Sequence, residues 1–143
     1  MVKNFLKIAF SVILLFVGFA NGGEPEPIKI FSYNVYFDDE TGAERYPTIL
    51  NYIAKQSDDV VLLQECTPTF LSLLSREPRF NKYFIKHGNK QGGYTNIILT
   101  SLPIIAAGDI KLKTNMGRSA PYITFKDYDL SIVNVHLESG ILD

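Results

Sequence analysis

The stretch VVLLQE, residues 60–65, decides how the rest of the chain is interpreted. The apolar run Val60–Leu63 is typical of a strand that is buried on both faces, since a half-exposed strand alternates apolar and polar residues. The run ends in Gln64-Glu65, and burying a carboxylate is costly unless it is paired or binds a metal ion. Glu65 is therefore either part of a site or a solvent-exposed residue at the end of the strand.

The segments on either side of this strand predict another strand and two helices. Residues 28–33 alternate as a strand does, and this strand ends at Asn34. Residues 38–42 are expected to form a polar loop, and Pro47 fits the first turn of a helix, where its missing N–H group is not needed. The segment Thr67–Arg76 begins with a capping threonine followed by a proline, which predicts a second helix.

After the second helix the sequence predicts short strands separated by turns. Glycine, proline and aspartate residues mark the turns, and residues 126–129 are expected to form a tight hairpin. We therefore predict an α/β fold in which helices pack on a mixed sheet. The expected strands are Tyr83–Lys86, Thr95–Thr100, Ile104–Lys113, Tyr122–Phe125 and Leu130–His136.

The length and composition indicate a packed globular domain with no general affinity for polyanions. The chain has 143 residues, about the length of one domain, and a net charge of −1. No broad basic surface follows from this charge, although a local basic patch is compatible with it. The single cysteine, Cys66, excludes an internal disulfide and a cysteine metal cage, and its position favours a buried filler over a reactive thiol.

The first segment, residues 1–23, has the features of a secretory signal peptide. Lys3 and Lys7 stand before and at the start of an apolar run that ends in Gly18-Phe19-Ala20. The run is short for a membrane span, although an uncleaved membrane anchor is the alternative. We therefore expect a secreted or periplasmic protein whose domain covers residues 24–143, with no stable membrane span after cleavage.

Three polar residues stand at the downstream ends of expected strands: Asn34, Glu65 and His136. Strand ends are where an α/β scaffold presents ligand-binding groups, so these side chains are expected to converge. Each also has an ordinary structural interpretation. Asn34 is a common turn former, Glu65 can be solvated, and His136 can be a hydrogen-bonded structural histidine.

The flanks of these three residues resemble a known superfamily. SYNV (32–35), LLQE (62–65) and HLES (136–139) resemble the endonuclease/exonuclease/phosphatase superfamily, which includes deoxyribonuclease I. YTNIIL (94–99) and NMGR (115–118) are similar to the tyrosyl-DNA phosphodiesterase 2 group of that superfamily. The resemblance covers residues 28 to about 140.

The resemblance implies a metal-dependent phosphodiester hydrolase of the nuclease or tyrosyl-DNA phosphodiesterase type. Glu65 would be the carboxylate that holds Mg²⁺, or alternatively Mn²⁺, because hard cations bind oxygen ligands. Asn34 and His136 would act at the scissile phosphate, and Asn34, Arg118 and Ser139 would bind the substrate. For Arg118 the alternative is a solvated charge on a hairpin. The phosphodiester could belong to a nucleic acid, a lipid head group or a small molecule.

Two departures from the family pattern limit what the resemblance implies. Tyr36 stands where the tyrosyl-DNA phosphodiesterase group commonly has an aspartate that helps to arrange the metal. The superfamily fold is a four-layer α/β sandwich whose second half brings an Asp-x-Asn strand end and a late Asp-His pair. Neither occurs here, and the other histidine, His87, is interpreted as a surface residue in a loop.

We therefore expect the first half of that sandwich, a mixed sheet with flanking helices, with the second half absent. Such a chain is expected to be inactive by itself. It would also leave an apolar sheet face uncovered, which a complementary half-domain could cover. The alternatives are a non-enzymatic degenerate half-domain and a secreted binding module.

Overall fold

A computed structural model describes residues 27–89, 93–115 and 118–137 of the chain. The expected signal peptide, residues 1–23, and Ser139 lie outside the described residues. The elements are β1 (Ile30–Asn34), α1 (Gly42–Gln56), β2 (Val60–Cys66), α2 (Pro68–Arg76), the 3₁₀ turn η1 (Pro78–Phe80), β3 (Phe84–His87), β4 (Thr95–Thr100), β5 (Ile104–Lys111), β6 (Ser119–Phe125) and β7 (Ser131–Val133).

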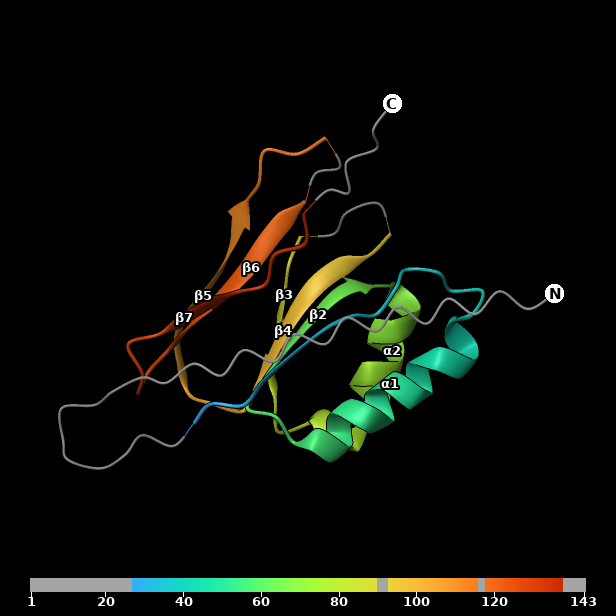
Figure 1. Ribbon diagram of the computed structural model, residues 1–143, viewed down its shortest axis with the longest axis horizontal. Coiled ribbons are helices and arrows are strands. Elements are labelled where there is room, and N and C mark those ends of the chain that lie inside the picture. The colour runs from blue at the N-terminus through green and yellow to red at the C-terminus, as the bar shows by residue number, and fades with distance from the viewer. Residues whose placement is uncertain (1–26, 90–92, 116–117, 138–143) are drawn as a thin grey trace.

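The strands form two sheets that face each other, and the helices cover the outer face of the larger sheet (Figure 1). The larger sheet is mixed and has the order β1-β2-β4-β3, in which β1 and β2 are parallel and the other pairs antiparallel. The smaller sheet is an antiparallel meander in the order β5-β6-β7. The α/β fold with a mixed sheet and packed helices is thus confirmed, and the meander forms a sheet of its own.

Strand β2 is buried on both faces, as its sequence predicts. Val61 and Leu63 pack in a core beneath the helices, together with Tyr46 of α1 and Phe70 of α2. Val60 packs in a second core between the two sheets, whose other buried members are Ile28, Ile98, Ile123, Phe125 and Ile132. The central strand thus links the helical layer to the smaller sheet and fixes the end of the sheet where Glu65 lies.

The second helix agrees with the sequence analysis, but the first begins earlier than expected. Thr67 caps α2 by accepting a hydrogen bond from the N–H of Phe70 at 3.1 Å. Helix α1 begins at Gly42, so the predicted first turn at Pro47 was wrong and Pro47 lies inside the helix. The buried ring of Tyr46 packs against Phe70, and this tertiary contact holds the extra turn despite the proline.

Several strand boundaries also differ from those expected: β3 spans Phe84–His87, β5 ends at Lys111 and β6 begins at Ser119. The last strand ends at Val133 and not at His136, because the side chain of Asn134 bonds to the larger sheet, as described below. His87 is the final residue of β3, so its placement in a loop was wrong, although it is exposed as expected.

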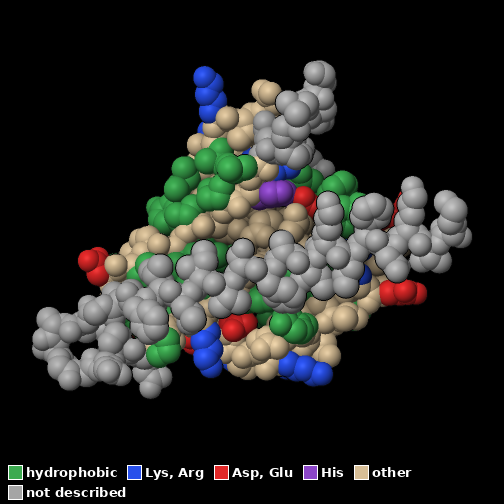
Figure 2. Space-filling model, in the orientation of Figure 1, with side chains coloured by type: hydrophobic (Ala, Val, Ile, Leu, Met, Phe, Trp, Pro, Cys, Tyr) green, Lys and Arg blue, Asp and Glu red, His purple; other side chains and the backbone are tan. Residues whose placement is uncertain are grey.

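The smaller sheet carries exposed apolar side chains on its outer face. In the strand register, Ile110 and Val133 share this face with Tyr122, which covers Gly108. Ile110 and Val133 are both exposed. Figure 2 shows hydrophobic side chains gathered over this part of the molecule. The expected sheet without a facing partner is not seen, since the two sheets pack against each other over a shared core, and the exposed apolar side chains of the smaller sheet lie on its outer face. Within the described residues, no helix is long and apolar enough to cross a membrane.

Candidate active site

Glu65 lies at an irregularity in the central strand. The register between β2 and β4 shifts between Leu63 and Cys66, and Glu65 in this interval has φ +58°. A bulge of this kind turns a side chain out of the regular alternation of a strand. A left-handed backbone is unfavourable for a glutamate, and strained residues of this kind cluster at functional sites. Glu65 is nevertheless only 8% exposed as a residue.

Among the described residues, two groups contact the Glu65 carboxylate. Its Oε2 accepts a hydrogen bond from the backbone N–H of Phe37 at 3.1 Å, and its Oε1 lies 3.4 Å from Nε2 of His136. Burial lowers the pKa of His136, the charge of Arg118 lowers it further, and Glu65 opposes both effects. His136 is therefore neutral at pH 7 and does not neutralise the carboxylate.

Asn34 lies at the end of β1, beside Gln64 of β2. Its side-chain oxygen accepts a hydrogen bond from the N–H of Tyr36 at 2.9 Å, which is the turn-forming role considered for it. The group that Asn34 can offer to a phosphate oxygen is thus its amide N–H. The structure brings Asn34, Glu65 and His136 to the same end of the two sheets.

Arg118 is buried, so the interpretation as a solvated hairpin charge was wrong. Its guanidinium donates to the backbone oxygen of His136 at 3.3 Å and to that of Leu137. It also donates to the hydroxyl of Tyr94 at 3.3 Å. Arg118 therefore holds in place the segment that presents His136, a structural role that the sequence did not reveal.

Asn134 is a residue of this site that the sequence analysis missed. Its amide N–H groups donate to the backbone oxygens of Leu63 at 2.9 Å and Ile97 at 2.8 Å, and its oxygen accepts from Gln64 at 2.7 Å. It thus joins the segment after β7 to the irregularity that carries Glu65. The sequence does contain a signal: in IVNVH (132–136) the polar Asn134 has the same parity as buried Ile132, while the valines are exposed.

Residues 31–139, most of the chain, match the Endonuclease/Exonuclease/phosphatase family. The chain belongs to this family. The comparison with curated proteins gives no match.

Solved structures of TDP2 resemble this family member and confirm the resemblance to the tyrosyl-DNA phosphodiesterase 2 group. A TDP2 from D. rerio humanized by 14 mutations has 28% identity and a TM-score of 0.67, with 78% of this chain and 48% of that chain covered. A D. rerio TDP2 complexed with a single-strand DNA product has 28% identity and a TM-score of 0.67, covering 79% of this chain and 47% of that chain.

A truncated TDP2 from Caenorhabditis elegans shares the fold at 22% identity, with a TM-score of 0.67. The match covers 78% of this chain and 47% of that chain. The family member described here thus spans about half the length of these structures and matches the first half of their fold.

The oxygen donors of this family member at the candidate site fit a divalent cation. Within the described residues, no group of three His, Cys, Asp or Glu side chains is arranged to hold a metal ion. Mg²⁺ needs no such group, since one or two carboxylates with several waters suffice. Glu65 fits this requirement, because it is a nearly buried carboxylate whose only ion-pair contact among the described residues is a neutral histidine.

We expect the stability of the metal-free protein to fall as the pH falls below about 6.5. The pKa of half-buried His136 is lowered mainly by burial, and that of the more exposed His87 is lowered by partial burial of its ring and by the charge of Lys86. Below pH 6.5 the unfolded chain therefore binds more protons than the folded chain, and the free energy of unfolding decreases. Thermal unfolding in EDTA between about pH 7.5 and about pH 5.5 measures this change. A His87→Asn/His136→Asn variant should lose less stability than the wild type over this range, and an equal loss would contradict the assignment.

Proposed function

We propose that residues 27–137 form part of the active site of a metal-dependent phosphodiester hydrolase. The observation that carries this proposal is the convergence of Asn34 and His136 beside the nearly buried carboxylate of Glu65, whose backbone is left-handed. Membership of the Endonuclease/Exonuclease/phosphatase family supports the reaction class. The D. rerio TDP2 solved with a single-strand DNA product supports nucleic acid as the substrate.

Each of the side chains has a proposed role, which for the described residues is consistent with their contacts. Glu65 would hold Mg²⁺ or Mn²⁺, which would neutralise charge on the phosphate and activate water. Asn34 would donate its amide N–H to a phosphate oxygen. Neutral His136 would donate a hydrogen bond to the same phosphate, where negative charge grows in the transition state. Arg118 would keep the segment after β7 in place, and Ser139, which follows it, would also bind the phosphate.

We propose that the 143-residue chain binds a phosphodiester but turns it over slowly. Its length is about half that of the D. rerio TDP2 structures, and a missing general acid or base alone typically costs a factor of 10²–10⁴ in rate. The test combines two measurements on the full chain: Mg²⁺-dependent binding of labelled oligothymidylate, and hydrolysis of bis-p-nitrophenyl phosphate with Mg²⁺, Mn²⁺ or EDTA. We expect Mg²⁺-dependent binding and little hydrolysis. Absence of binding would contradict the proposed function.

One observation supports an additional role in binding a complementary half-domain. The outer face of the smaller sheet exposes Ile110 and Val133, as a surface that another polypeptide covers would do. Sedimentation of the chain at increasing concentration tests whether this face associates. We expect an Ile110→Lys/Val133→Lys variant to sediment as a smaller species than the wild type.

A further inference from the structure

Two adjacent aromatic side chains are exposed beside the candidate active site. Tyr36 is 53% exposed and Phe37 is 51% exposed. Both belong to the loop between β1 and α1. Two neighbouring rings in water are unusual on a surface, and exposed aromatic side chains are enriched where proteins bind partners.

The backbone of these two residues is bonded directly to the candidate catalytic side chains. The N–H of Tyr36 donates to Asn34 at 2.9 Å, and the N–H of Phe37 donates to Glu65 at 3.1 Å. The two rings therefore belong to residues whose backbone N–H groups are hydrogen-bonded to the side chains proposed to bind the metal ion and the phosphate. A group attached to a phosphate bound there would lie within reach of the rings.

The loop is held in position rather than free to collapse over the site. Arg45 donates to the backbone oxygens of Tyr36 at 3.0 Å and Asp38 at 2.9 Å. Asp39 accepts hydrogen bonds from Thr67 at 2.7 Å and Tyr46 at 2.9 Å. Tyr36 has φ +69°, a left-handed conformation that these contacts maintain. Exposed rings on a fixed loop are preorganised for a ligand.

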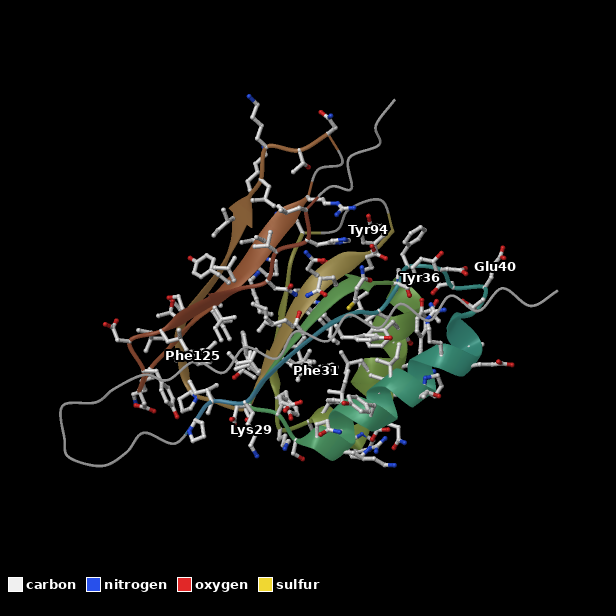
Figure 3. All side chains as sticks on the ribbon, viewed as in Figure 1. Lys29, Phe31, Tyr36, Glu40, Tyr94 and Phe125 are labelled. Carbon is white, nitrogen blue, oxygen red and sulfur yellow. The ribbon has the colours of Figure 1, made fainter. Side chains whose placement is uncertain are left out.

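A third aromatic residue, Tyr94, packs against this pair of rings from the segment that precedes β4. The ring centroids of Phe37 and Tyr36 lie 5.4 Å apart. The ring of Phe37 also stacks on that of Tyr94, with centroids 5.5 Å apart and an interplanar angle of 29°. Figure 3 shows Tyr36 and Tyr94 at the same end of the larger sheet, although they come from different segments. Together, Tyr36, Phe37 and Tyr94 form an aromatic surface next to Glu65.

We infer that Tyr36 and Phe37 are specificity residues that stack on a nucleobase of single-stranded nucleic acid whose phosphodiester lies at Asn34 and Glu65. This inference rests on the proposed function and names its substrate class. Unpaired bases stack on protein aromatic rings whatever their sequence. The guanidinium of Arg45 lies 5.3 Å from the ring centre of Tyr36. This positive charge attracts a nucleic acid backbone and disfavours a cationic lipid head group on the same ring.

Fluorescence anisotropy with the full chain in Mg²⁺ tests this inference. The probes are a labelled oligothymidylate and the same oligonucleotide with abasic sites in place of its bases. We expect the wild type to bind the base-bearing probe about 10-fold more tightly than the abasic probe. Phe37→Ala should bring this ratio close to one while leaving abasic binding unchanged, and Phe37→Tyr should keep the ratio, since it keeps the ring.

The matched control is Phe84→Ala. Phe84 is also an exposed aromatic residue, at 45%, but it begins β3 and pairs with Thr100, at the opposite end of the larger sheet from Glu65. This variant should bind both probes as the wild type does. Equal binding of both probes by the wild type, or an unchanged ratio in Phe37→Ala, would overturn the inference and leave the proposed function standing. Binding of neither probe would contradict both.

Discussion

A Glu65→Gln variant of the full chain is expected to lose its stabilisation by Mg²⁺. Glutamine keeps the size of the side chain and an oxygen that accepts the hydrogen bond from Phe37, but it lacks the charge that attracts the cation. For the wild type, Mg²⁺ at a hundred times its Kd should add about 2.7 kcal/mol to the free energy of unfolding. The variant should show almost none of this. Any Mg²⁺-dependent hydrolysis should fall by orders of magnitude, since the metal would no longer be held.

Thermal unfolding with and without Mg²⁺ measures the effect. In EDTA the variant should be as stable as the wild type or more so, because a nearly buried charge has been removed. Glu77→Gln is the matched control, since it removes a carboxylate at the end of α2 that pairs with Arg79, away from the site. If Glu65→Gln kept the Mg²⁺ stabilisation of the wild type, Glu65 would not be the metal ligand.

Asn134→Ala is expected to be the most destabilising single substitution near the site. It removes the donor to two buried backbone oxygens, those of Leu63 and Ile97, and the shortest of the hydrogen bonds made by the side-chain amide of Gln64. Each buried polar group left without a partner costs about 1–3 kcal/mol, so a loss of about 4 kcal/mol is expected. Against a typical total stability of about 5–15 kcal/mol, this is a large share.

Urea unfolding of Asn134→Ala and of a control, Ser131→Ala, measures this loss. The hydroxyl groups of Ser131 in β7 and Thr124 in β6 are hydrogen-bonded at 2.8 Å, but this contact is exposed to water. Its removal should change the free energy of unfolding by less than about 0.5 kcal/mol. A similar small change for Asn134→Ala would mean that the junction between the two sheets does not depend on this side chain.

Local sequence signals predicted the central strand β2 and the start of helix α2. The apolar run before Glu65 gave the central strand, and Thr67 with Pro68 gave the start of α2 to the residue. The order of strands and helices then led to an α/β fold with a mixed sheet, because parallel strands need a crossover helix. The resemblance of short motifs led to the family, which the comparison over residues 31–139 shows.

Features that depend on contacts distant in sequence were not predictable in the same way. The early start of α1 depends on the packing of Tyr46 against Phe70, which the helical pattern around Pro47 does not contain. The burial of Arg118 depends on carbonyl groups of residues 136 and 137. In both cases a tertiary contact overrides a local preference.

The hydrogen bond between Gln64 and Asn134 joins residues 70 positions apart in the chain. The contacts of α1 and α2 with the larger sheet close much shorter loops than this hydrogen bond does. Contacts between residues far apart in the chain are expected to form later than these local contacts, because more chain entropy is lost in bringing the residues together. A partly folded chain that has formed the helices and the larger sheet would therefore still lack His136 beside Glu65. During synthesis, the same delay means that the helical half can fold before the segment carrying His136 has docked. Assembly in this order would bring the histidine beside the carboxylate only in the last steps of folding.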